Sequence, residues 1–282
     1  MCGSDHSTGV RLVVRNPAVA GQFYSGSKES LAKEAGVLIE GSAEKKEDAI
    51  GVISPHAGYV YSGTVAGLTL SSIKPKPIYL IMGPNHTGLG NPFSLSASDS
   101  WATPLGNVTV NKTLSERILK NCPQISRDEF AHIHEHSIEV QLPILQILQE
   151  NFTMVPLVIS QGSIEQYRRI GQAIAKSIKE LKLEKDIAII ASSDMTHYES
   201  RESAEEKDSR AIDAILKLDE EALLERVKQF DISMCGYAPA AIMIIAAKLL
   251  GAKKAKLIKY QTSADISGDY SSVVGYAGIV IG

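Results

Sequence analysis

The chain has 282 residues, of which 44% are hydrophobic and 22% are charged, so it is long enough to bury a full core. Its formal net charge of −3, without a Lys/Arg-rich tract, does not support binding to nucleic acid or to an anionic membrane. Three scattered cysteines do not suggest a disulfide framework, and no apolar run reaches the ~18 residues of a membrane span, so we expect a cytoplasmic protein.

Short apolar runs rich in β-branched residues alternate with segments of helical periodicity. The runs predict buried strands at 50–54, 78–83, 153–159, 187–193, 255–262 and 273–281. The periodic segments predict helices at 63–73, 112–120, 137–149, 164–181, 203–217, 220–230 and 237–250. This alternation predicts an α/β fold: a single three-layer α/β/α domain with a mostly parallel or mixed central sheet. The last two strands have no helix between them, so that pair is expected to be antiparallel.

Two histidines follow the first two predicted strands in the same way. Each strand leads into a proline-containing turn and then a histidine, which gives Pro55-His56 and Pro84-Asn85-His86. Functional residues of open α/β sheets gather at the carboxyl ends of the strands. Imidazole is a common ligand of Zn, Fe and Cu, so the pair predicts a metal site more strongly than either histidine alone. A histidine bonded within a turn is the alternative for each.

The predicted strand at 187–193 leads into Asp194, and His197 follows three residues later. The carboxylate can orient an imidazole or act as a ligand, and the imidazole can carry a proton. Asp194 would equally suit a cap of the following helix. We expect His197 to point toward the same rim as the other two histidines.

The segment 131–139 is the densest cluster of ionisable residues. His136 and Glu139 are three residues apart at the start of a predicted helix and could share one face. The cluster could be a second metal site or a surface loop, and His132 and His134 are expected to be solvated.

Cys235 directly precedes a predicted helix. A thiol at a helix N-terminus has a lowered pKa, which suits a metal ligand or a nucleophile. The alternative is a small buried hydrophobic side chain.

Several of these motifs together resemble the Memo family. They are Pro-His-Ala-Gly-Tyr at 55–59 and Gly-Pro-Asn-His at 83–86, with ordered matches at 16–24, 135–143, 192–197, 235–236 and 269–273. The Memo family is similar in fold to the LigB-like class III extradiol dioxygenases, which cleave catechol rings with Fe(II). The resemblance covers residues 15–282, which would form one domain, and it leaves 1–14 as a flexible N-terminal tail.

The resemblance also implies roles for individual residues. It makes His56, His86 and Cys235 the metal ligands, and it places Asp194 and His197 as catalytic residues of the same pocket. Substrate-binding residues are expected at His136, Tyr59, Tyr61 and Phe23. The expected cofactor is one transition metal, Fe(II) first, with copper or zinc as alternatives.

Cys235 also marks a departure from the ring-cleaving enzymes, which use two histidines and a carboxylate. A thiolate favours Zn and Cu(I) more than a carboxylate does, and O₂ can oxidise it, so ring cleavage is not simply inherited. The leading hypothesis is a mononuclear metal-dependent oxidoreductase of unknown substrate. The alternatives are a non-catalytic peptide-binding adaptor that reuses the pocket, as family association with phosphorylated peptides suggests, and a hydrolase with Cys235 as nucleophile.

Partners follow from the same resemblance. A small molecule or a peptide is the expected substrate. In prokaryotes, relatives accompany a radical-SAM protein and an AMMECR1-like protein, which makes both expected partners.

Overall fold

The computed structural model describes residues 12–41 and 45–282. Its strands are β1 (Val14–Arg15), β2 (Gly51–Ser54), β3 (Ile78–Pro84), β4 (Phe93–Leu95), β5 (Ser100–Thr103), β6 (Gly106–Val110), β7 (Ser126–Arg127), β8 (Thr153–Ile159), β9 (Ile187–Ser192), β10 (His197–Glu199), β11 (Ala255–Thr262) and β12 (Val273–Ile281). Its α-helices are α1 (Lys28–Leu38), α2 (Tyr59–Ser71), α3 (Lys112–Asn121), α4 (Gln141–Leu148), α5 (Ile164–Glu180), α6 (Arg201–Leu216), α7 (Glu220–Gln229), α8 (Tyr237–Leu249) and α9 (Ala264–Ser267), and a 3₁₀ turn spans Glu129–Ala131.

The strands form one mixed sheet in the order β1-β5-β6-β8-β3-β9-β2-β12-β10, with β11 on β12. Its centre, β8-β3-β9-β2, is entirely parallel. The strands β11 and β12 pair antiparallel, as predicted from the absence of a helix between them. The expected α/β class with a largely parallel, mixed sheet is confirmed.

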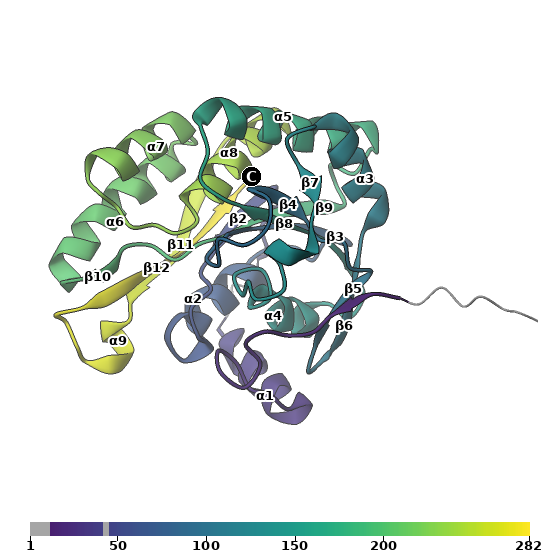
Figure 1. The fold of residues 1–282 in the computed structure, drawn as a ribbon. Helices are drawn as coiled ribbons and strands as arrows, with labels where there is room; N and C mark the ends of the chain where they lie inside the picture. Colours follow the sequence, from purple (N-terminus) through teal and green to yellow (C-terminus); the bar gives the residue numbers. More distant parts are fainter. Residues whose placement is uncertain (1–11, 42–44) are drawn as a thin grey trace, which may run out of the picture.

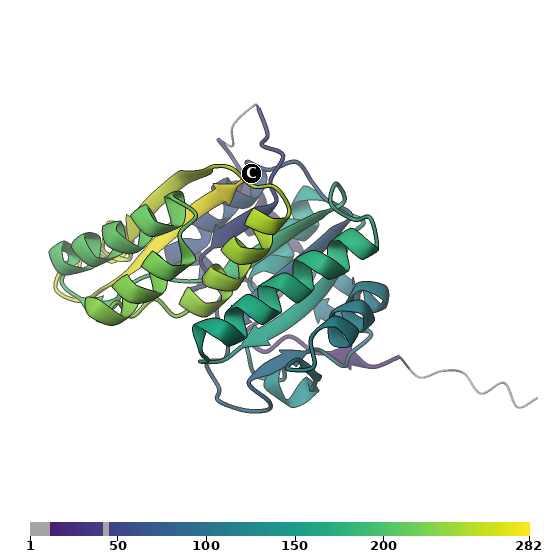
Figure 2. The ribbon, with the colours of Figure 1, turned by 90° about the horizontal axis from the view of Figure 1, so that it is seen from above.

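Helices cover both faces of this sheet. In Figure 1, α3, α5, α6, α7 and α8 lie above the sheet, and α1, α2 and α4 lie below it. The view from above in Figure 2 shows α5, α8 and the α6–α7 pair side by side across one face.

The two faces follow from the alternation of side chains along the central strands. In β3, Leu80 and Met82 belong to the core under α5 and α8, while Tyr79 and Ile81 belong to the core on the other side. All four side chains are almost completely buried, which explains why the strand is an unbroken apolar run. Local signals also mark helix starts: Ser163 and Gln166 form a capping box at α5.

Some predicted boundaries are displaced. The helix expected from 137 begins only at Gln141, because 137–140 form turns. Pattern reading also overlooked α1 and the short strands β1, β4, β5, β6, β7 and β10. Of the expected tail, residues 1–11 lie outside the described residues, and Val14 at its end pairs with Ser100.

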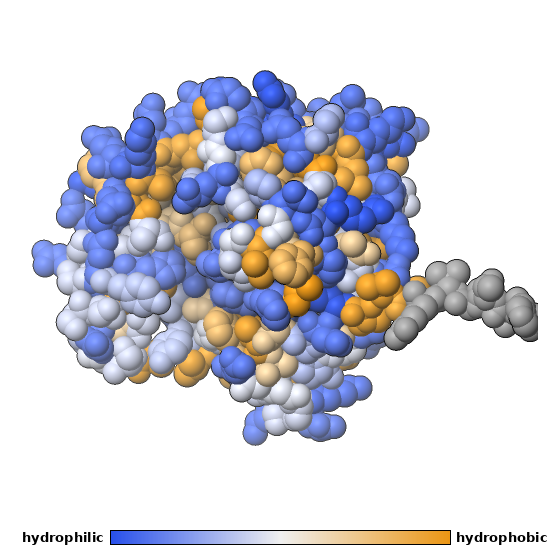
Figure 3. Space-filling model, in the orientation of Figure 1, coloured by the Kyte–Doolittle hydropathy of each residue, from blue (hydrophilic) through white to orange (hydrophobic). Residues whose placement is uncertain are grey.

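The described part of the chain has no helix that is both long and apolar enough to cross a membrane. On the face shown in Figure 3, apolar residues lie in separate patches among hydrophilic ones.

Candidate metal centre

Three neighbouring parallel strands end at the same edge of the sheet and carry the main candidates. His56 follows β2, His86 follows β3, and Asp194 follows β9, which lies between them. The register aligns Ser54 at the end of β2 with Ser192 at the end of β9. These candidate residues therefore lie at the carboxyl ends of parallel strands, where functional residues of open α/β sheets gather.

Hydrogen bonds hold the buried imidazole of His56 in one tautomer. The Ser192 hydroxyl has one proton, which it donates to the Ser137 carbonyl at 2.7 Å. It must therefore accept from His56 Nδ1, 2.9 Å away, as it also accepts from Gln141 Nε2 at 2.9 Å. His56 Nε2 is therefore the unprotonated ring nitrogen, whose lone pair can bind a metal.

Glu135 holds His86 in the same manner. Its carboxylate accepts from His86 Nδ1 at 3.0 Å and from the His86 backbone N–H at 2.7 Å. It also accepts from the backbone N–H groups of His136 and Ser137. Burial opposes ionisation of Glu135, but these donors, with His86 first among them, lower its pKa to about 2. The ionised carboxylate leaves His86 Nε2 free to face the cluster.

His136 completes a cluster of three histidines. One ring nitrogen from each of His56, His86 and His136 lies within 4.8 Å of the others, so the three are close enough to hold a metal ion. The His136 ring stacks on His86 with centroids 4.8 Å apart and meets His56 edge-on at 5.6 Å. Gly83 makes this packing feasible, because a side chain there would collide with Ser137 next to His136.

Cys235 lies beside the cluster. Its Sγ is 3.3 Å from His56 Nε2 and accepts from the Asp194 backbone N–H at 3.3 Å. Gly236 permits this close approach to β9, because a Cβ at that position would overlap Ser192 and Ser193. Burial and the charge of Asp194 raise the pKa of the Cys235 thiol, so the lowered pKa expected from the helix N-terminus is wrong.

Asp194 fastens the turn that carries His56. Its Oδ1 accepts from the His56 backbone N–H at 2.8 Å. Burial raises the pKa of Asp194 to about 6, against the lowering effect of that N–H. The alternative of a helix cap is wrong, because α6 is capped by Ser200.

His197 sits on β10 at the margin of the site. Its backbone N–H donates to Ser233 Oγ at 2.8 Å, and its Nδ1 donates to the Ser233 carbonyl at 2.9 Å. Nε2 is therefore the ring nitrogen that is left to accept a proton.

The three aromatic residues expected to bind substrate lie in different surroundings. Phe23 packs edge-on against His136 with ring centroids 4.7 Å apart. Tyr59 is buried, and its hydroxyl donates to the Val140 carbonyl at 2.8 Å. Tyr61 is 40% exposed.

Two expectations for the segment 131–139 are corrected. His132 is fully buried rather than solvated, and its Nε2 bonds the Ser94 carbonyl, whereas His134 is exposed as expected. Glu139 does not join His136 but forms a buried ion pair with Arg15 at 2.7 Å. Arg15 also donates to the carbonyls of residues 132 and 135, so β1 fastens the loop that presents His136.

The donor set fits a transition metal. Burial, together with the other histidines, lowers the pKa of His56 and His136, so both are neutral imidazoles at neutral pH. Three imidazoles and one thiol are borderline to soft donors that suit Zn, Fe and Cu. The carboxylates of Glu135 and Asp194 accept hydrogen bonds from N–H groups of His86 and His56, so they orient these histidines.

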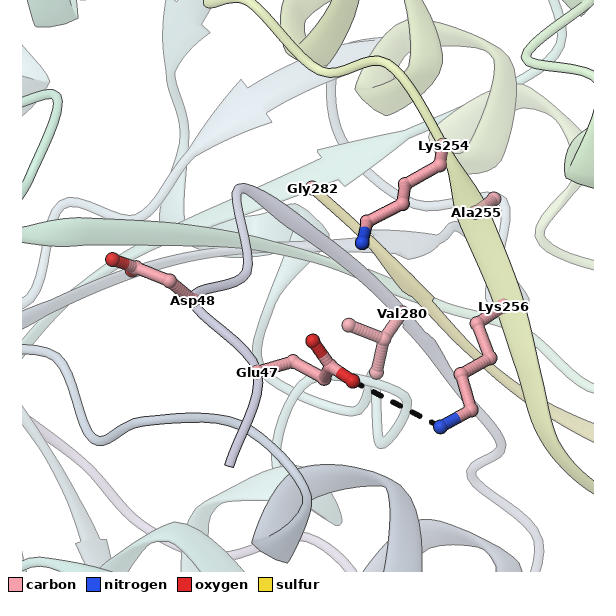
Figure 4. Close-up of a pocket in the computed structure, with 7 residues that line it drawn as sticks. All are labelled: Glu47, Asp48, Lys254, Ala255, Lys256, Val280 and Gly282. Carbon is pink, nitrogen blue, oxygen red and sulfur yellow. Dashed lines mark ion pairs between the residues drawn. The ribbon is translucent and has the colours of Figure 1, made fainter. Parts of the chain in front are cut away.

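A separate cavity lies at the opposite edge of the sheet, where β2 begins and β12 ends. Figure 4 shows it between Glu47, Asp48, Lys254 and Lys256, with Lys256 paired to Glu47 at 3.8 Å. Within the described ranges 12–41 and 45–282, neither histidine nor cysteine lines this cavity, which distinguishes it from the histidine cluster.

The fold and the cluster define a class of protein: a single α/β domain with a candidate metal centre at the carboxyl edge of its parallel strands. The chain belongs to the Memo family, because the profile described as Memo-like protein matches residues 15–280. It is 42% identical to a MEMO1 family protein of Methanosarcina mazei, over 96% of this chain and 100% of the relative. It is 41% identical to MEMO1 family proteins of Methanopyrus kandleri, over 94% and 98%, and of Aquifex aeolicus, over 95% and 98%.

The sequence motifs indicated most of the residues described above but not those that orient them. Ser192, Gln141 and Glu135 lie within motifs used for the resemblance, yet their hydrogen bonds to the histidines depend on tertiary contacts. A carboxylate close to several histidines, as in 132–136, is the signal that could have drawn attention to Glu135.

Proposed function

We propose that the protein is a mononuclear metal-dependent oxidoreductase that acts on a small molecule. The observation that carries the proposal is the convergence of the histidine cluster, in which His56 and His86 are each anchored through Nδ1. Imidazoles that are oriented and partly shielded from water form a preorganised metal site. In this proposal His56 and His86 are two of the ligands.

The third ligand is proposed to be Cys235, with His136 as the competing donor. Cys235 Sγ is 3.3 Å from His56 Nε2, and His136 has a ring nitrogen within 4.8 Å of those of both other histidines. If Cys235 is the ligand, His136 remains free to hydrogen-bond a substrate at the centre. The two assignments differ in whether sulfur contacts the metal, which spectroscopy can detect.

Bound iron would supply one-electron and O₂ chemistry, and copper could also serve a redox role. The chain itself would supply orientation and proton transfer. Ser192 and Glu135 hold the two imidazoles, and Asp194 holds the turn of His56. His197 can accept a proton at Nε2 because its Nδ1 is bonded to the Ser233 carbonyl.

Metal reconstitution tests this proposal. The purified chain is loaded anaerobically with Fe(II), Zn(II) or Co(II), and bound metal is measured by elemental analysis. We expect one metal per chain, with loss of binding in His56→Ala and His86→Ala. A Co(II) thiolate charge-transfer band that disappears in Cys235→Ser but not in His136→Ala assigns the third ligand to sulfur.

Failure of all three metals to bind stoichiometrically would remove the metal centre, and with it the oxidoreductase. A charge-transfer band that survives in Cys235→Ser would reject the sulfur ligand. Turnover is tested separately, by O₂ consumption of the Fe(II) protein with candidate substrates and with His197→Gln as the comparison.

A further inference from the structure

A groove runs beside the histidine cluster, on the side of His86 and Cys235. Its volume is about 610 Å³, and both of these side chains line it. Its walls come from the chain after β3, the turn after β8 and the segment before α8. The groove thus joins the proposed metal centre to the surface, but its walls are not the aromatic residues Phe23, Tyr59 and Tyr61 expected from sequence.

The lining of this groove is uncharged apart from the titratable His86 and Cys235. Among the residues the structure describes there, none is Asp, Glu, Lys or Arg. The polar lining side chains are amides and hydroxyls: Asn85, Ser160, Gln161 and Ser233. The apolar lining includes Ile159, Ile232, Met234, Tyr237 and Ala238.

The acidic residues nearest to the groove lie behind its lining. Glu135 accepts a hydrogen bond from His86 Nδ1, and the Asp194 backbone N–H donates to Cys235 Sγ. A phosphate or carboxylate in the body of the groove would lose its hydration without meeting a lysine or arginine among the described residues that line it, which is unfavourable. An uncharged molecule with an apolar or aromatic body would bury its surface against Ile232 and Met234 and could bond the amide of Gln161.

We propose that this groove binds the body of an uncharged, largely apolar small molecule and discriminates against anionic ones. The proposal deepens the function proposed above and rests on it, because the inner end of the ligand would face the proposed metal centre. It also disfavours the phosphopeptide adaptor, since a phosphate group would find neither arginine nor lysine among the described residues of this groove.

Two ligands with the same ring system test the charge preference: 2-naphthol and 2-naphthyl phosphate. Binding is measured by equilibrium dialysis on the full chain after metal removal with a chelator, so that coordination to a metal does not contribute. We expect 2-naphthol to bind at least about tenfold more tightly than the phosphate, which corresponds to 1.4 kcal/mol.

Variants at Gln161 locate the binding. Gln161 is exposed at the groove wall, so substitutions there should not disturb folding. Gln161→Lys should raise the affinity for the phosphate relative to that for 2-naphthol about tenfold by supplying a cation. Gln161→Trp should weaken 2-naphthol at least about fivefold by filling the groove. Gln172→Lys makes the same charge change on an exposed position of α5 outside the groove and should alter neither affinity.

The proposal is overturned if neither ligand binds saturably, or if the phosphate binds the unmodified chain as tightly as 2-naphthol. It is equally overturned if Gln161→Lys behaves like Gln172→Lys, or if Gln161→Trp leaves 2-naphthol binding intact. Zn(II) binding of the same variants separates the two proposals. If 2-naphthol fails to bind while Zn(II) still binds, the groove proposal fails and the metal centre stands. If Zn(II) fails to bind while 2-naphthol still binds, the metal centre fails and the groove proposal stands.

Discussion

The substitution Glu135→Gln tests how the candidate centre is held together. The Glu135 carboxylate accepts from His86 Nδ1 and from the backbone N–H groups of His86, His136 and Ser137, and its side chain is fully buried. Three of these donors bond Oε1, and the His86 backbone N–H bonds Oε2. A glutamine oxygen can replace Oε1, but its NH₂ group then faces the His86 backbone N–H.

The cost can be estimated from these contacts. One buried donor without an acceptor costs about 1–3 kcal/mol. Loss of the negative charge weakens the three remaining hydrogen bonds by about 1 kcal/mol each. Together the free energy of unfolding should fall by roughly 4–6 kcal/mol. Because His86 also loses the carboxylate that orients it, Zn(II) affinity should fall by about 10–100-fold.

Urea unfolding of the metal-free chain measures the first effect, and chelator competition for Zn(II) below the unfolding transition measures the second. Glu129→Gln is the matched control. Glu129 Oε2 accepts from the Ser96 hydroxyl and the backbone N–H groups of Ala97 and Ser98 but contacts no histidine of the cluster. The Glu129→Gln variant should have a lower free energy of unfolding but an unchanged affinity for Zn(II). A Glu135→Gln chain that binds Zn(II) within twofold of the unmodified protein would refute the reasoning.

Two further predictions concern buried carboxylates. Glu139→Ala should lower the free energy of unfolding by about 3–5 kcal/mol, because it strands the buried guanidinium of Arg15. Urea unfolding checks this, with Arg117→Ala at a solvent-exposed ion pair expected to show little loss, and similar losses in both would contradict it. Burial raises the pKa of Asp208, so its contribution to stability is present at about pH 4 and is lost as pH rises through the raised pKa. Asp208→Asn should therefore gain stability relative to the unmodified protein with rising pH, and a pH-independent difference between their unfolding free energies would oppose this.

Much of the fold could be predicted because the central strands and helices carry strong local signals. The strands at 153–159, 255–262 and 273–281 were predicted with the bounds that the structure shows. The apolar runs at 153–159 and 273–281 are almost completely buried, so the sequence pattern and the packing agree there, whereas most side chains of 255–262 are only half-buried. The short strands β1, β4 and β7 have only two or three residues, and backbone pairing with distant segments defines them.

The segment 131–139 shows why local patterns were insufficient at the site. Its ionisable residues suggested a solvated loop, yet His132, Glu135 and Glu139 are buried. Arg15, more than 110 residues away in the chain, pairs with the Glu139 carboxylate and donates to the backbone carbonyls of His132 and Glu135. The Glu135 carboxylate is satisfied by His86 and by nearby backbone N–H groups, and His132 bonds the Ser94 carbonyl. No periodicity within the segment contains that information.

Residue chemistry alone identified His56, His86 and Cys235 as residues that could bind a metal, and strand-end positions placed the two histidines on one edge. Only the tertiary structure decided that β9 lies between their strands and brings Ser192 to His56. It also placed a ring nitrogen of His136 within 4.8 Å of those of both histidines, so His136 joins Cys235 as a candidate for the third ligand. The reason is physical: donor chemistry belongs to each side chain, whereas the orientation of its lone pairs depends on hydrogen-bond partners that folding brings from distant segments.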